Sequence, residues 1–325
     1  MNTVLNDAIK GASVHKKISK KVFEYVRPGI TLKEIVQFVE TSIQEETSSD
    51  SLNAGIGFPV GVGVNNCVAH YTPNYEELDY VLLNNDIIKI DYGVHYNGMI
   101  IDSAFTLHFD PKYDEFIHIS KETTDIAIKH SGPDAILGEI GREVEEFIKS
   151  KEITIDGKVY PLTVMKDLSG HLIKPFEIHA GKAVPNVAIH YPLRMMEGEF
   201  YAVEPFITTG NGISILGGPN SHFMIDKNRI NEINRINDDS EKDFYNLIYQ
   251  NYKTLPFCQR WFYDMDLYST PKGNYNLLLK NLENKRIIKS YPPIYDIDKS
   301  IVSQFEHTIY IRDKGILNLT KNSNY

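Results

Sequence analysis

The chain of 325 residues has 42% hydrophobic and 11% aromatic content, enough to bury one large core or two smaller ones. Its formal net charge of −9 excludes nucleic acid as the main ligand, because phosphate binding requires a basic surface. The two cysteines, Cys67 and Cys258, have no CxxC pairing, which excludes a disulfide framework and a cysteine-ligated zinc site. No apolar run is long enough for a membrane span and the N-terminus lacks a secretory signal, so we expect a cytoplasmic protein without a membrane partner.

Two helices are expected at the start of the chain. Apolar residues at helical spacing predict the first helix over residues 1–26, and the sequence RPGI ends it. Thr31 and Glu34 have the T-x-x-E spacing of a capping box. We therefore expect the second helix to begin directly after Thr31.

The pattern P-x-x-x-L-x-E-I-x-x-x-V-E occurs twice, from Pro28 and from Pro133, so every matched residue is displaced by 105 positions. Both copies fall on a predicted helix that another helix precedes and strands follow. This favours a duplicated α/β half, with a chance match as the alternative. The expected strands are 62–71, 86–96 and 99–109 in the first half, then 199–208 and 304–313 in the second. Between about 222 and 290 the sequence turns charged, Asn-rich and helical, which predicts an insertion in the second half.

The stretch IDYGVHYNGMIID places Asp91 and Asp102 between strongly apolar neighbours. Asn97-Gly98 favours a two-residue hairpin turn, in which Asp91 faces Ala104 and Asp102 faces Gly93. The two aspartates would then be diagonal neighbours on one face, about 7 to 8 Å apart at the backbone. Two ionised carboxylates in an apolar setting repel, so they need a proton, a basic side chain or cations. In the alternative interpretation, one Asp caps a turn and the other faces solvent.

Further polar residues in apolar segments favour cations. Glu204 lies in EFYAVEPF, Glu306 lies in QFEHTI, and His171 and His179 lie in SGHLIKPFEIHAG. Each of them alone would indicate a salt bridge or a structural histidine. Together they form a hard, oxygen-rich set of donors, which suits a pair of Mn, Fe, Co or Zn ions rather than a structural zinc finger.

Five motifs carry a family resemblance: NNCVAHYTPN (65–74), KIDYGVHYNGMIIDSAFT (89–106), LSGHLIKPFEIHAGKAVPN (168–186), EGEFYAVEPF (197–206) and YPPIYDIDKSIVSQFEHTI (291–309). Through them the chain resembles the type 2 methionine aminopeptidases, which share the pita-bread fold with prolidase and creatinase. The resemblance runs from about residue 5 to the C-terminus, and the long stretch between Glu204 and Glu306 indicates the type 2 branch. It implies an α/β fold of two pseudo-symmetric halves, with an antiparallel sheet covered by helices. Residues 1–325 would form a single catalytic domain, with a helical insertion at about 222–290.

The implied activity is removal of the initiator methionine from nascent proteins and peptides with a small second residue. Two divalent ions (Mn, Co, Fe or Zn) would activate the attacking water, held by ligands at matching positions: Asp91, Asp102, His171, Glu204 and Glu306. Glu204 would also move the proton to the leaving amine, and His179 would donate a hydrogen bond to the oxyanion. His70 would contact the substrate near the scissile amide, at the position that fumagillin-type epoxides attack. The methionine pocket would comprise Phe58, Ile178, His222 and Tyr291, although ordinary core packing is the alternative for Phe58.

The resemblance also implies partners: N-terminal peptides of nascent proteins, association with the ribosome, and a monomeric state. The chain shows no long charged N-terminal extension, to which ribosome contact is attributed in eukaryotic relatives. Tyr92 stands where the family commonly has Phe, and we expect its hydroxyl to reach solvent. Two rival functions share the fold. A prolidase or aminopeptidase P should carry a large N-terminal domain, and a non-catalytic binding protein should have lost its metal ligands.

Overall fold

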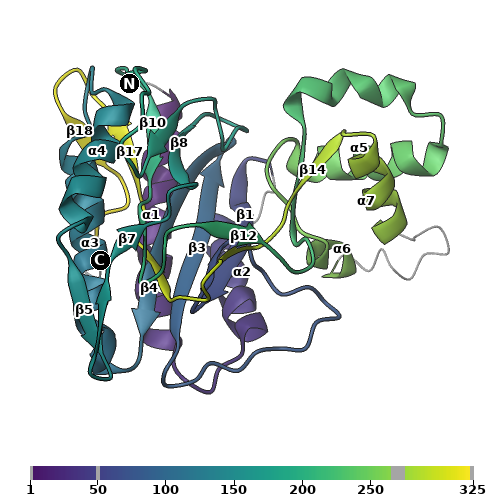
Figure 1. Ribbon diagram of the computed structural model, residues 1–325. Helices are drawn as coiled ribbons and strands as arrows, with labels where there is room; N and C mark the ends of the chain where they lie inside the picture. The colour runs from purple at the N-terminus through teal and green to yellow at the C-terminus, as the bar shows by residue number, and fades with distance from the viewer. Residues whose placement is uncertain (1–2, 49–51, 265–274, 323–325) are drawn as a thin grey trace.

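Two similar halves, each a pair of helices packed on an antiparallel sheet, form the body of the protein in this computed structural model (Figure 1). The structure describes residues 3–48, 52–264 and 275–322. The helices of the first half are α1 (Thr3–Tyr25) and α2 (Leu32–Thr47), and those of the second are α3 (Asp114–Lys129) and α4 (Leu137–Ile148). Within the described ranges, no helix is both long and apolar enough to cross a membrane.

The two main sheets lie edge to edge. The first has the order β1-β3-β4, made of β1 (Ala54–Val64), β3 (Ile87–Tyr96) and β4 (Met99–His108). The second has the order β18-β17-β10-β8-β9, made of β8 (Ser169–Ile173), β9 (Ala183–Pro185), β10 (Phe200–Val203), β17 (His307–Ile311) and β18 (Ile316–Asn318). Strands β4 and β17 meet at the junction, where the Asp102 amide donates to Thr308 Oγ1 at 2.8 Å and the Glu306 amide donates to the Ala104 carbonyl at 2.9 Å. These bonds join the two halves.

The repeated pattern marks equivalent positions in the two halves. Helices α2 and α4 begin at its two leucines, and the residue before each one forms an isolated antiparallel bridge, Thr31 with Val81 and Ile136 with Arg194. The capping box at Thr31 is confirmed, because its side chain and that of Glu34 bond reciprocally to the backbone. In contrast, Ile136 offers no side-chain cap. The duplicated half is thus confirmed, with a different helix start in each copy.

The apolar positions of the pattern face the sheets. Ile35 and Val39 of α2 are fully buried, and Ile140 and Val144 of α4 are each 1% exposed. All four belong to one hydrophobic core that both sheets share. The burial of these equivalent stripes explains why the two copies keep the same spacing of apolar residues.

The hairpin of β3 and β4 has the expected register. Tyr96 pairs with Met99 across the turn, and Asp91 pairs with Ala104, while Asp102 pairs with Gly93. Both turn residues have positive φ, 48° at Asn97 and 79° at Gly98, which defines a type I′ turn. The two aspartates therefore lie on one face of the sheet, as predicted.

Three of the expected strands are wrong in their extent. The strand expected over 62–71 ends with β1 at Val64, and β2 (Cys67–Ala69) follows a turn. The segment 199–208 splits into β10 and β11 (Phe206–Thr208), and the strand expected over 304–313 splits into β16 (Val302–Gln304) and β17. Strands β16 and β11 belong to a separate small sheet with β7 (Thr163–Val164). Pro205 explains one break, since proline donates no hydrogen bond to a ladder. Strand β18 was not expected.

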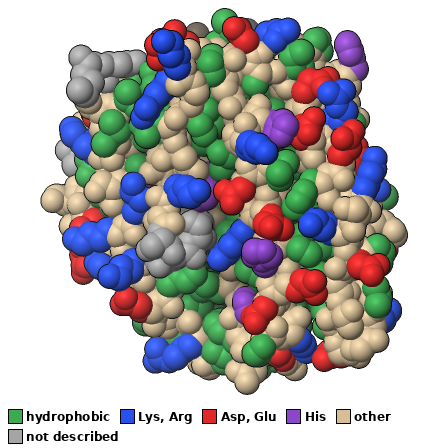
Figure 2. Space-filling model, turned by 90° about the vertical axis from the view of Figure 1, so that its left-hand side faces the viewer, with side chains coloured by type: hydrophobic (Ala, Val, Ile, Leu, Met, Phe, Trp, Pro, Cys, Tyr) green, Lys and Arg blue, Asp and Glu red, His purple; other side chains and the backbone are tan. Residues whose placement is uncertain are grey.

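The remaining elements are short. Strand β12 (Ser214–Leu216) forms a sheet with β15 (Ile294–Asp296) and β2, in the order β12-β15-β2. A hairpin joins β5 (Glu152–Ile155) to β6 (Lys158–Pro161), and the 3-10 helix η1 (Pro111–Tyr113) precedes α3. Figure 2 shows the side of the molecule that lies at the left of Figure 1, where lysines and arginines are interspersed with aspartates and glutamates. The described part of this face thus presents mixed charge rather than a basic surface.

Residues 222–291 form a lobe to the right of the body in Figure 1. Strands β13 (His222–Ile225) and β14 (Ile288–Tyr291) pair at its base, and η2 (Lys227–Arg235), α5 (Asp239–Tyr252), α6 (Arg260–Asp264) and α7 (Tyr275–Asn284) lie between them. The lobe has its own hydrophobic cluster, which includes Phe244 and Phe262. Residues 265–274 of the expected insertion lie outside the described residues. The described part of the segment thus contains a strand pair beside its helices.

A buried ion pair ties the lobe to the first half. Arg260 donates from both terminal nitrogens to the Glu40 carboxylate of α2, each at 2.8 Å, and Trp261 Nε1 donates to the same carboxylate at 3.1 Å. Such a bidentate pair fixes the relative position of two elements more firmly than a single contact does. Helix α6 is thereby held against α2.

We expect Gly98→Ala to destabilise the protein by about 2 kcal/mol, because alanine is strained at positive φ. The added Cβ would also lie 2.3 Å from the Phe176 ring. The matched control is Gly132→Ala, since a Cβ at Gly132 has no neighbour within 4 Å. Urea unfolding of both variants tests this, and equal stability of the two would contradict the role of the turn.

Candidate active site and metal centre

The four acidic residues of the candidate site lie within or next to strands of both halves. Asp91 and Asp102 lie inside the continuous strands β3 and β4. Glu204 lies directly after β10, and Glu306 lies directly before β17, at the two points where the chain passes from one sheet to another. The sheet breaks that the sequence did not predict therefore place two of the acidic side chains.

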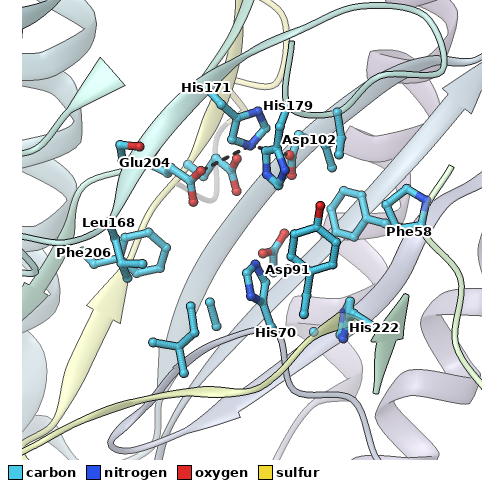
Figure 3. Close-up of a pocket in the computed structure, with 18 of the residues that line it drawn as sticks. Phe58, His70, Asp91, Asp102, Leu168, His171, His179, Glu204, Phe206 and His222 are labelled. Carbon is cyan, nitrogen blue, oxygen red and sulfur yellow. Dashed lines mark ion pairs between the residues drawn. The ribbon is translucent and has the colours of Figure 1, made fainter. Parts of the chain in front are cut away.

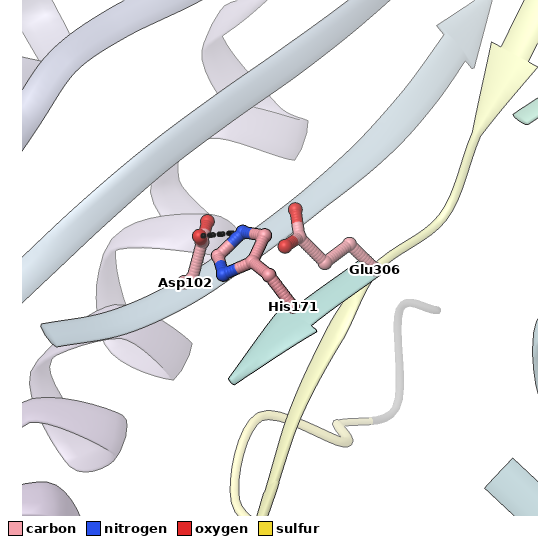
Figure 4. Close-up of side chains that lie close together, drawn as sticks. All are labelled: Asp102, His171 and Glu306. Carbon is pink, nitrogen blue, oxygen red and sulfur yellow. Dashed lines mark ion pairs between the residues drawn. The ribbon is translucent and has the colours of Figure 1, made fainter. Parts of the chain in front are cut away.

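His171 lies between the carboxylates (Figures 3 and 4). Its Nε2 is 3.5 Å from Asp102 Oδ2 and 3.4 Å from Glu204 Oε1. Ligand atoms of Asp102, His171 and Glu306 all lie within 4.8 Å of one another. Asp91 and Glu204 line the same cavity, so the structure brings together all five residues expected to bind metal.

Burial makes the ionised form of this carboxylate cluster unfavourable in the absence of a cation. It raises the pKa of all four carboxyl groups, that of Asp91 to about 7, and the nearby carboxylates raise the pKa values of Asp102, Glu204 and Glu306 further. Burial also lowers the pKa of His171, with the neighbouring His179 contributing, so the ring stays neutral. A neutral imidazole beside several carboxylates does not compensate their charge.

Several carboxylate oxygens of the cluster lack a hydrogen-bond donor within the described part of the chain. Among the described residues, none donates a hydrogen bond to Asp91 Oδ1 or to either buried oxygen of Glu306. A contact between the carboxyl groups of Asp102 and Glu306 requires a proton or a cation between them. Oxygen donors with one neutral imidazole suit divalent cations such as Mn, Fe, Co or Zn. The residues present therefore fit a metal centre.

Gln304 is a site residue that the sequence analysis missed. Its Nε2 donates to Glu204 Oε2 at 3.1 Å, and its side chain also bonds to Asp91, which lowers the pKa of that carboxyl group. The residue is 1% exposed. Its position two residues before Glu306, in an apolar segment, was the available signal. Gln304 orients two of the four carboxylates without adding charge.

His179 and His70 face the same cavity and remain neutral. The His179 ring packs edge-on against His171 with centroids 4.4 Å apart, and burial lowers its pKa to about 4. Burial, aided by His222 and His179, lowers the pKa of His70 to about 3. His70 has a positive φ of 61°, a conformation that is uncommon outside glycine and directs its ring into the cavity. Neutral imidazoles can donate hydrogen bonds without attracting a counterion.

The end of the cavity near β13 is shaped for an apolar side chain (Figure 3). The cavity has a volume of about 420 Å³, and four expected pocket residues line it here: Phe58, Ile178, His222 and Tyr291. Gly93 makes room for Phe58, because a Cβ there would lie 2.4 Å from the Phe58 ring. His222 Nε2 lies 3.1 Å from the Pro59 carbonyl, which only accepts, so this nitrogen carries the proton. The pocket is thus mainly apolar, with the His222 ring held in place at its edge.

The expectation for Tyr92 is wrong. Its side chain is fully buried, and its hydroxyl donates to the His15 carbonyl at 3.0 Å rather than reaching solvent. The His15 ring stacks on it with centroids 4.0 Å apart. The hydroxyl therefore joins α1 to β3 behind Asp91.

The profile of metallopeptidase family M24 matches residues 8–227. The chain belongs to this family. Family M24 enzymes are metal-dependent peptidases, so the protein is a hydrolase that uses divalent metal, and the donor set described above agrees with this. A non-catalytic binding protein of this fold was expected to lack the metal ligands, whereas this chain has Asp, His or Glu at all five expected positions.

Individual relatives show to which branch of family M24 the chain is similar. The chain is 39% identical over 322 residues to methionine aminopeptidase 2 of Encephalitozoon hellem, covering 99% of this chain and 88% of the relative. It is 40% identical over 312 residues to methionine aminopeptidase 2 of Debaryomyces hansenii, covering 95% of this chain and 72% of the relative. The resemblance to the type 2 methionine aminopeptidases is confirmed.

Solved structures share the fold of this metallopeptidase. A thermophilic Arx1 has a TM-score of 0.81 at 14% identity, covering 100% of this chain and 92% of its own. Methionine aminopeptidase from Thermotoga maritima has a TM-score of 0.65 at 18% identity, covering 99% and 98% of the two chains. The pita-bread fold is therefore confirmed.

Metal binding at neutral pH should release about one proton or more per chain, because burial keeps part of the carboxyl population protonated in the metal-free protein. Calorimetric titration with Mn²⁺ at pH 7 in buffers of different ionisation enthalpy measures this number. The release should decline as the pH rises above about 7, the pKa of Asp91. A proton count of zero at pH 6 would contradict the raised pKa values.

Asp102→Asn should reduce the bound metal, since the amide removes one anionic donor from the cluster. Elemental analysis of the purified variant measures the loss. Asp125→Asn is the matched control, because Asp125 is an exposed residue of α3. A metal content equal to that of the control would exclude Asp102 as a ligand.

Proposed function

We propose that the protein removes the initiator methionine from nascent proteins and peptides whose second residue is small. The observation that carries this proposal is a single cavity with the carboxylate and histidine cluster beside a pocket of Phe58, Ile178, His222 and Tyr291. The 39 to 40% identity to curated methionine aminopeptidases 2 supports the same substrate. A methionine side chain is unbranched and apolar, which suits this pocket.

Two divalent ions per chain would be held by Asp91, Asp102, His171, Glu204 and Glu306. When bound, such ions lower the pKa of a water molecule and polarise the scissile carbonyl. The ligand set accepts Mn, Co, Fe or Zn, because it consists of oxygen donors with one imidazole nitrogen.

The side chains of the protein perform the remaining steps. Glu204 accepts a proton from the attacking water and delivers it to the leaving amine. His179 donates a hydrogen bond to the developing oxyanion. His70 contacts the substrate near the scissile amide, with its ring held between His222 and Tyr291 at centroid distances of 6.0 and 5.7 Å. A neutral imidazole carries one N–H, so each histidine can donate one hydrogen bond at physiological pH.

Cleavage before proline is the rival activity within the fold. Prolidase from Pyrococcus furiosus has a TM-score of 0.57 at 15% identity, a likeness of fold alone, and this chain covers 65% of it. The closer sequence relatives favour methionine release instead.

The proposal extends to organisation and setting. We assign residues 1–325 to a single catalytic domain, with 222–290 as an insertion subdomain. The protein would act as a monomer in the cytoplasm, on peptides that emerge from the ribosome and in association with it. These assignments rest on the family resemblance.

Methionine release should be observed from Met-Ala-Ser after addition of Mn²⁺ or Co²⁺, with little cleavage of an Ala-Pro-Ser peptide. Chromatographic detection of free methionine measures the reaction. Preferential cleavage of the Xaa-Pro bond would favour the prolidase activity. Absence of cleavage with every metal would contradict peptidase activity.

His179→Ala should lower kcat by more than tenfold, because loss of one oxyanion donor typically costs about 3 kcal/mol. Its metal content should stay near that of the wild type, since His179 is no proposed ligand. His118→Ala serves as the control, with a side chain that is 71% exposed on α3. An unchanged kcat for His179→Ala would remove this residue from the mechanism.

A further inference from the structure

A row of apolar side chains leads out of the cavity across the sheet β12-β15-β2. Ile294 of β15 pairs with Ala69 of β2 on one side and with Leu216 of β12 on the other. Directly paired residues of antiparallel strands share a face. Ala69 and Ile294 line the cavity, so Leu216 continues the same wall by one strand.

Leu216 is exposed although it extends a cavity wall. Strand β12 is the edge of its sheet, and the Leu216 side chain is 62% exposed. The preceding residue, Ile215, is 51% exposed but points to the opposite face, because side chains alternate along a strand. Leu216 and Ile215 are therefore similarly exposed, but their side chains lie on opposite faces of the sheet.

Hydrogen bonds fix β12 beside the cavity. Asp167 lines the cavity, and its Oδ2 accepts from the Ser214 amide at 3.0 Å and from Ser214 Oγ at 2.7 Å. The Lys166 amide donates to the Gly212 carbonyl at 2.8 Å. Leu216 thus keeps a defined position relative to the site.

The row lies at the end of the cavity away from the methionine pocket. Ile294 and Phe206 belong to one hydrophobic cluster, against which Ala69 and Leu168 pack, whereas Phe58 and Ile178 belong to another. Figure 3 shows Leu168 and Phe206 on one side of the carboxylates and Phe58 and His222 on the other. A peptide with its methionine in the pocket can therefore extend from the carboxylates toward the Ala69 end.

We propose that the row Ala69, Ile294 and Leu216 binds the third and fourth residues of the peptide substrate and favours apolar side chains there. The proposal rests on the proposed function and deepens it. Two strand spacings of about 4.8 Å separate the ends of the row, which leaves room for two consecutive residues of an extended chain at about 3.3 Å each. Leu216 is the outermost contact and determines specificity at these positions.

Comparison of two peptides tests the proposal, Met-Ala-Leu-Leu-Ser and Met-Ala-Ser-Ser-Ser, which share the scissile bond. The wild type should show at least a fivefold higher kcat/KM for the leucine peptide. Leu216→Ser should reduce this ratio below twofold with little change for the serine peptide. Ile215→Ser is the matched control and should keep the wild-type ratio.

Two results would overturn the proposal: equal kcat/KM for both peptides in the wild type, or a wild-type ratio in Leu216→Ser. Failure to release methionine from either peptide would contradict the proposed function instead. Photo-crosslinking of the metal-free protein with Met-Ala peptides carrying photo-leucine at positions three and four decides the inference without turnover. Crosslinks should map to the row, with residues 214–216 among them, and crosslinks confined to segments outside the row would refute it.

Discussion

The burial of four carboxyl groups around one neutral histidine is the constraint on which this structure depends. Desolvation and mutual repulsion raise the pKa values of all four, and three of their oxygens receive no hydrogen bond from the described residues. Such a cluster persists only where a rigid frame holds it or a cation neutralises it. Here the frame comes from two hydrogen bonds at the junction of the halves, from the Asp102 amide to Thr308 Oγ1 and from the Glu306 amide to the Ala104 carbonyl.

The duplicated architecture explains how the cluster is assembled. Each half contributes two acidic residues, which lie in β3 and β4 in the first half and directly beside β10 and β17 in the second. In the first half the carboxylates lie within regular strands, and the register of the hairpin places both on one face of the sheet. In the second half they occupy sheet breaks, where the chain turns toward the cavity. The site therefore exists only when both halves are folded against each other.

Features of the fold that depend on short stretches of sequence could be predicted from the sequence alone. The capping box at Thr31, the type I′ turn at Asn97-Gly98 and the repeated helix pattern depend on short-range geometry, and each was confirmed. The convergence of His171 with distant acids was not a local property. Residue types alone predicted a shared donor set that included His171 and His179, and the family resemblance identified His171 as the ligand. Gln304 escaped notice because a single amide carries no charge pattern. The sheet breaks and β18 depend on tertiary pairing that no short sequence window contains.

We propose that the buried carboxylate cluster binds two cations. Anomalous diffraction from crystals of the protein grown with Mn²⁺ tests this most directly. We expect two anomalous peaks in the cavity, contacted by side chains of both halves, with Asp102 and Glu306 among the contacts. No peak, or peaks only outside the cavity, would contradict it.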